Sequence, residues 1–108
     1  MTIELPEPIS AYYEADRNNK WGVGDCFTDD AFVIDEGNAY TGRDAIQKWK
    51  EASAKKYKYT ADPFAVDVKG DRTIVAAHLI GDFPGSPLDP RYAFTLRGDK
   101  IASLEIAL

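Results

Sequence analysis

One carboxylate stands out because it interrupts an apolar run. Residues 31–36 predict a short strand that ends in Asp35 and Glu36. Successive strand side chains point to opposite faces, so only one of the two acids should face a pocket. At the rim of an apolar cavity, a carboxylate is poorly solvated and gains proton affinity. Asp35 could then take a proton from a carbon next to a carbonyl. The alternative is a strand-end aspartate that hydrogen-bonds the turn Gly37-Asn38.

His78 is the only histidine of the chain, in the middle of a strand predicted over residues 73–83. If it faces the pocket, it could pair with Asp35 as a proton carrier; the alternative is a structural histidine. The alternation of apolar residues does not decide which face of the strand His78 is on, because both faces carry apolar residues. Arg91 is equally open: it could bind an acidic substrate or pair with an acid on the sheet surface.

The chemistry of metals and cofactors has little support in the sequence. The single cysteine, Cys26, has no histidine near it, so we interpret it as a small buried hydrophobe. No glycine-rich loop that could cradle a phosphate is present. We therefore expect no metal and no organic cofactor.

A first helix begins at Pro6 and Pro8, since proline is tolerated in the first turn. Helical spacing predicts one buried stripe along it, made of Ile9, Tyr12, Tyr13 and Asp16. The two tyrosines are more simply core than catalytic. A short buried helix is predicted within residues 20–27, although Gly22 and Gly24 weaken it.

A second helix should begin after Thr41 or Gly42, either of which can cap it. Its predicted buried face consists of Ile46, Trp49, Ser53 and Tyr57. Five lysines gather toward its C-terminal end, where they suit the helix dipole: Lys48, Lys50, Lys55, Lys56 and Lys58. We interpret them as a solvated face, with an anion site as the alternative.

After residue 59 the apolar pattern changes to period two, which predicts strands over 64–68, 73–83, 91–97 and 101–107. Helices followed by a strand meander predict one α+β domain over residues 1–108, with a curved antiparallel sheet wrapped around two or three helices. Large aromatic residues should form the core and the rim of any cavity, where they would suit a hydrophobic ligand: Trp21, Tyr40, Trp49, Phe83 and Tyr92.

The composition and net charge argue against some classes of binding partner. The 44% hydrophobic fraction is typical of a globular protein, and the net charge of -5 argues against binding to nucleic acid or to an anionic membrane. No signal peptide or membrane-spanning run is found, so we expect a cytoplasmic protein.

Two segments of the chain resemble the SnoaL-like branch of the nuclear transport factor 2-like superfamily. They are Phe27-Thr28-Asp29-Asp30-Ala31-Phe32-Val33-Ile34-Asp35 and, after it, Tyr40-Thr41-Gly42-Arg43-Asp44-Ala45-Ile46. The resemblance covers nearly the whole chain and implies a cone of curved sheet closed by helices. Its members include ketosteroid isomerases, polyketide cyclases and non-catalytic binding modules, so the fold does not settle the function. It also implies a homodimer that pairs through the outer face of the sheet.

The same resemblance aligns Asp35 with the general base of the ketosteroid isomerases and places Tyr12 at their oxyanion-hole tyrosine. Their late aspartate has no counterpart, because Pro90 or Arg91 falls at that position with Asp89 beside it. Two hypotheses follow. The protein could bind a small hydrophobic carbonyl compound and transfer its protons in isomerase or cyclase chemistry, or it could be a non-catalytic binding or dimerisation module with a closed pocket.

Overall fold

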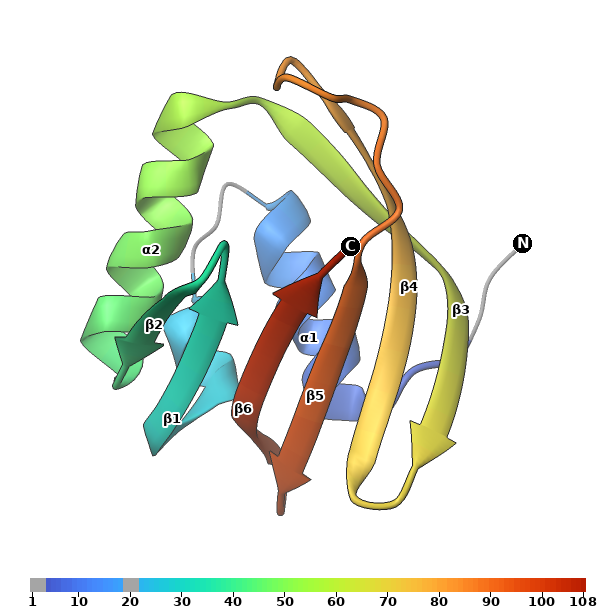
Figure 1. The fold of residues 1–108 in the computed structure, drawn as a ribbon. Coiled ribbons are helices and arrows are strands. Elements are labelled where there is room, and N and C mark those ends of the chain that lie inside the picture. The colour runs from blue at the N-terminus through green and yellow to red at the C-terminus, as the bar shows by residue number, and fades with distance from the viewer. Residues whose placement is uncertain (1–3, 19–21) are drawn as a thin grey trace.

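The computed structural model describes residues 4–18 and 22–108. In chain order their elements are α1 (Glu7–Arg17), the 3-10 turn η1 (Gly24–Cys26), β1 (Phe27–Asp35), β2 (Asn38–Thr41), α2 (Arg43–Lys56), β3 (Tyr59–Lys69), β4 (Arg72–Gly81), β5 (Arg91–Arg97) and β6 (Lys100–Ala107). Figure 1 shows a curved sheet with both α-helices on its inner side. The predicted α+β class is confirmed.

The sheet is mixed, not purely antiparallel as the meander suggested. Its strand order is β2-β1-β6-β5-β4-β3, and β1 runs parallel to β6 while the other neighbours are antiparallel. The parallel pair arises because β1, an early strand, lies beside β6, the last strand, and runs in the same direction. Register shifts on β1, β3 and β5 interrupt the ladders. Such irregularities bend a strand and increase its twist.

The first helix forms as predicted, with Pro6 at its N-cap and all four residues of the predicted stripe buried. The second helix begins after Gly42, whose φ of 91° is available to glycine at little cost. Of the helix predicted within 20–27, residues 20 and 21 lie outside the described residues, and residues 24–26 form the single turn η1, preceded by Gly22 at a φ of 78°. The short edge strand β2 was not predicted, because its four residues read as a turn and a cap.

The core lies between α1 and the sheet. Tyr12 and Tyr13 are buried there in edge-to-face contact, with ring centroids 5.1 Å apart. Tyr12 also packs against Phe27 and Phe94, and Tyr13 against Tyr92. Neither α-helix in the described part of the chain is long and apolar enough to cross a membrane.

Candidate functional site

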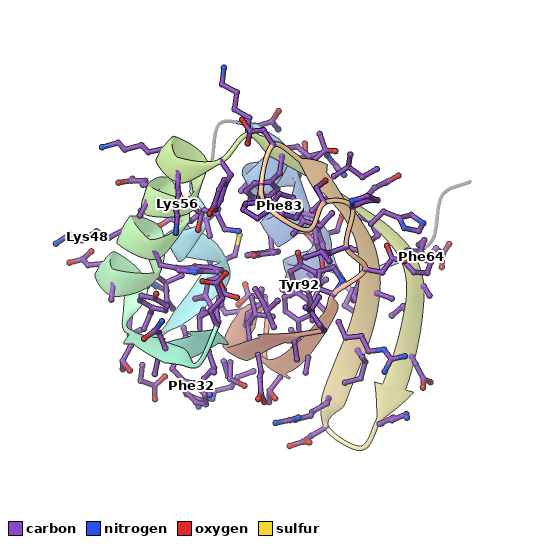
Figure 2. The ribbon with its side chains drawn as sticks, turned by 45° about the horizontal axis from the view of Figure 1, so that its top comes forward. Phe32, Lys48, Lys56, Phe64, Phe83 and Tyr92 are labelled. Carbon is purple, nitrogen blue, oxygen red and sulfur yellow. The ribbon has the colours of Figure 1, made fainter. Side chains whose placement is uncertain are left out.

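A hollow of about 380 Å³ opens between α2 and the inner face of the sheet. Its walls come from α2, from the ends of β1 and β6, and from β3 to β5 with the loop after β4. The side chains that line it are Asp35, Glu36, Trp49, Lys50, Ser53, Lys56, Tyr57, Tyr59, Leu79, Phe83, Pro84, Leu88, Tyr92 and Ile106. Figure 2 shows Phe83 and Tyr92 on the inner side of the sheet, whereas Phe32 and Phe64 point away from it.

Asp35 lies in this hollow and is held by a tryptophan. It ends β1, is half-buried, and its Oδ2 accepts a hydrogen bond of 3.1 Å from Nε1 of Trp49 on α2. Trp49 is the single donor to Asp35 among the described residues, which leaves further lone pairs of the carboxylate available to a ligand. Glu36 also lines the hollow, so the prediction that only one acid would face it is wrong. The backbone of Glu36 has left the strand, with a φ of 53°, and strand alternation no longer applies.

One residue of the lining, Lys50, belongs to a buried ion pair that the sequence did not predict. Nζ of Lys50 is 3.1 Å from Oδ1 of Asp16 and 3.1 Å from the hydroxyl of Tyr59, which donates a 3.0 Å hydrogen bond to the same Asp16 oxygen. Lys50 is 4% exposed and Asp16 is 3% exposed. The interpretation of all five lysines as a solvated face is therefore wrong for Lys50.

Aromatic rings surround this ammonium. Nζ of Lys50 lies 4.4 Å from the ring centroid of Trp49 and 5.1 Å from that of Tyr12, distances at which a cation is attracted to a ring face. Burial alone would lower the pKa of Lys50, but the Asp16 carboxylate and Tyr59 outweigh it and raise that pKa above its ordinary value. Lys50 therefore remains an ammonium at neutral pH.

Two tyrosine hydroxyls beneath the hollow lack hydrogen-bond partners among the described residues: Oη of Tyr12 and Oη of Tyr13. Burial raises the pKa of both phenols, and the Asp16 charge adds to the effect on Tyr12. Tyr12 is behind the residues that line the hollow. Its hydroxyl meets one requirement of the predicted oxyanion role, an uncommitted donor, but not direct exposure to the hollow.

His78 does not pair with Asp35, which corrects the expected proton-carrier arrangement. It lies on the outer face of β4, between the buried Ala77 and the inward-facing Leu79. Its ring stacks on Phe64 at 4.0 Å, and its Nδ1 is 2.7 Å from Oδ1 of Asp89.

Arg91 is on the outer face as well, where it contributes to a second depression. Of the two alternatives, a substrate contact in the inner hollow does not fit this position.

The predicted aromatic residues divide into three groups. Trp49, Phe83 and Tyr92 line the hollow, as expected for ligand contacts. Tyr40 lies behind Trp49, with ring centroids 5.9 Å apart. Trp21 lies outside the described residues. No group of three or more side chains that could ligate a metal occurs within 4–18 and 22–108.

The residues that sequence reasoning missed had a detectable signal. Asp16 was already on the buried stripe of the first helix, and Lys50 follows the buried Ile46 by four residues, which returns to the same helix face. One acid and one base on two buried helix faces indicate an ion pair between the helices.

The whole chain resembles known structures. A candidate polyketide cyclase from Sinorhizobium meliloti is 40% identical, with a TM-score of 0.89 over 94% of both chains. A ketosteroid isomerase-like protein from Catenulispora acidiphila is 23% identical over 97% of this chain and 87% of its own, with a TM-score of 0.84. A nuclear transport factor 2-like protein from Cytophaga hutchinsonii is 11% identical over 98% and 90%, with a TM-score of 0.75. The last two show the fold alone.

These similarities define a cone-shaped α+β protein with its hollow at one end of the sheet. The chain belongs to the SnoaL-like branch of the nuclear transport factor 2-like superfamily. It matches no protein-family model and no curated protein.

Proposed function

We propose that this protein binds a small hydrophobic carbonyl compound in the hollow and moves one of its protons through Asp35. The observation that carries the proposal is the position of Asp35: a half-buried carboxylate among aromatic walls, oriented by the Trp49 indole at 3.1 Å. A carboxylate held in this way can act as a base toward a carbon acid next to a carbonyl. The candidate cyclase that is 40% identical supports chemistry of this class.

The test needs no knowledge of the natural substrate. Cyclic and aromatic ketones are incubated with the protein in deuterated water, and exchange at the carbon next to the carbonyl is followed by NMR. We expect catalysed exchange for some members of this panel. Asp35→Asn should lower the exchange rate by about 10²–10⁴-fold, because it removes the base while keeping an acceptor for Trp49. Asp89→Asn, a carboxylate change on the outer face, is the matched control and should leave the rate unchanged.

The second candidate is a binding module without catalysis. The lack of contact between His78 and Asp35 favours it, since the pair of proton carriers expected of a cyclase is not assembled. Tight ketone binding without exchange, equal in the wild type and in Asp35→Asn, would establish this function instead.

We also propose a homodimer that pairs through the outer face of the sheet. The outer side chains of Phe32 and Phe64 are each 42% exposed, and that of Ile80 is 55% exposed. Sedimentation equilibrium should give twice the chain mass, and Phe32→Asp should give the single-chain mass while near-ultraviolet circular dichroism remains unchanged. A monomeric wild type at high protein concentration contradicts this proposal.

A further inference from the structure

The ammonium of Lys50 has one hydrogen-bond donor to spare. An ammonium carries three N–H groups, and Asp16 and Tyr59 account for two of them. Within the described residues, its other neighbours are ring faces. Because Lys50 also lines the hollow, its third N–H is available to a ligand.

A second donor lines the hollow from the sheet, which faces α2. The side chain of Tyr92 lines the hollow, and its hydroxyl has no hydrogen bond within the part of the chain that the structure describes. Burial raises the pKa of Tyr92 to about 12; the Lys50 ammonium opposes this shift, while the Asp16 and Asp35 carboxylates add to it. The hydroxyl is therefore protonated at neutral pH, and it is close enough to Lys50 and Asp35 to sense both charges.

We propose that Lys50 Nζ and the Tyr92 hydroxyl form a subsite for a ligand oxygen that carries negative charge, in the same hollow as Asp35. The ligands are then cyclic or aromatic ketones that bind as enolates, and phenols that bind as phenolates. The inference rests on the proposed function, because it names the substrate class of the same hollow.

The charges of the hollow fit a ligand that arrives neutral. Asp16 already neutralises Lys50, so the pair does not attract every anion; it offers a short, directed, charge-assisted donor. When Asp35 takes the proton, the C–H electron pair forms the new C=C bond and the carbonyl π pair moves to oxygen. Asp35 becomes neutral as the ligand becomes anionic, so the total charge of the hollow is unchanged. Return of the proton to a different carbon completes an isomerisation.

Lys50 is unsuited to the other common role of a buried lysine. A lysine that forms a Schiff base must attack as the neutral amine, but the Asp16 carboxylate and the Tyr59 hydroxyl stabilise the ammonium. We therefore assign Lys50 a role as donor to the ligand oxygen and not as nucleophile.

The first test uses 4-nitrophenol, whose absorbance reports its ionisation when bound. It is titrated against pH in the Asp35→Asn background, where no carboxylate at residue 35 opposes the phenolate. We expect the pKa of the bound phenol to be at least about one unit lower there than in the same background carrying Asp16→Asn and Lys50→Met, a tenfold difference in phenolate affinity. The two changes are made together so that no buried charge is left unpaired.

Lys48→Met is the matched control, because Lys48 lies on the same helix but is exposed and does not line the hollow. It should leave the bound pKa unchanged. Tyr92→Phe tests the same subsite if the triple variant does not fold, and should raise the bound pKa by a smaller amount. Three results would overturn the subsite: an equal bound pKa with and without Lys50, an equal effect of Lys48→Met, or no binding of the phenol.

Hydrogen exchange separates this inference from the proposed function. If the wild type exchanges ketone hydrogens through Asp35 and Asp16→Asn with Lys50→Met leaves that rate unchanged, the subsite is wrong while the function stands. If the bound phenol shows the expected pKa dependence but no ketone exchanges, the subsite stands and the proton-transfer function fails. If both hold, the loss of Lys50 should lower the exchange rate by about 10²-fold, as for other oxyanion donors.

Discussion

The inner and outer sides of the sheet differ in how their charged residues are buried. On the inner face, Asp16 and Lys50 are buried together and Asp35 is fixed by an indole. On the outer face, His78 and Asp89 are paired but each is about half exposed to water. Leu79 lines the hollow and its neighbour His78 lies outside it. A shift of one residue along a strand therefore decides whether a side chain belongs to the candidate site.

Burial also changes what an ion pair contributes. Exposed pairs contribute about 0–1 kcal/mol, because water and salt screen them. For a buried pair, the cost of removing both charges from water offsets much of their attraction, so its net contribution is small until one partner is lost. The inner pair should therefore respond strongly to a single change and weakly to a double one.

Lys50→Met alone should destabilise the protein strongly. It leaves the Asp16 carboxylate buried without its cation, which typically costs about 3–5 kcal/mol of the free energy of unfolding. Urea unfolding measures this loss, and Lys56→Met on the exposed part of the same helix should stay within about 0.5 kcal/mol of wild type. The double variant with Asp16→Asn should recover most of the loss. Equal stability of the two single lysine variants would contradict the buried pair.

Removal of an inner aromatic ring should have a similar cost. Phe94 is fully buried and packs against Tyr12, Tyr13 and Tyr92. Phe94→Ala should lower the free energy of unfolding by about 3–5 kcal/mol, because a cavity remains. The outer-face control is Ile80→Ala, where the side chain is 55% exposed, and its cost in urea unfolding should be below about 1 kcal/mol. Similar losses for both variants would mean that the outer face is as closely packed as the core.

Most of the fold follows from local patterns in the sequence. The start of α1 was predictable because Pro6 and Pro8 restrict the backbone, and the long strands because their apolar residues alternate. The parallel pairing of β1 with β6 was not, since residues far apart in the chain make it. The edge strand β2 has only four residues, too few for a periodic signal.

The residues of the candidate site were predictable only where a residue type conflicts with the pattern around it. Asp35 was identified because a carboxylate interrupts an apolar strand. The side of His78 was not, since Ala76 and Ile80 on the outer face are as apolar as Ala77 and Leu79 on the inner face. Lys50 was missed for a different reason. Its charge suggested an exposed residue, whereas its position four residues after Ile46 indicated a buried one. A charged residue at buried spacing should prompt a search for an opposite charge on another buried face.

Alkaline pH should weaken the inner face more than the outer one. The folded state raises the pKa of Lys50 and, by burial, those of four tyrosines: Tyr12, Tyr13, Tyr59 and Tyr92. The folded protein thus holds these protons more tightly than the unfolded chain, whose groups titrate near pH 10–10.4. The stability linked to them is complete below about pH 10 and is lost as pH rises further. Urea unfolding between pH 8 and pH 11.5 measures the loss, and Asp16→Asn with Lys50→Met should make it shallower. A flat stability over this range would contradict the pKa shifts.

The smallest expected effect is that of His78→Gln, which removes the outer-face imidazole. The ring contacts Phe64 and Asp89 on a half-exposed surface, so its loss should lower the free energy of unfolding by less than about 1 kcal/mol. If Asp35 acts without a histidine partner, ketone exchange should stay within about twofold of wild type, because no bond to the hollow is lost. The comparison with Asp35→Asn in the same exchange assay is decisive. A rate in His78→Gln that falls as far as in Asp35→Asn would mean that the imidazole reaches the hollow during turnover, and the separation of the two faces would not hold in solution.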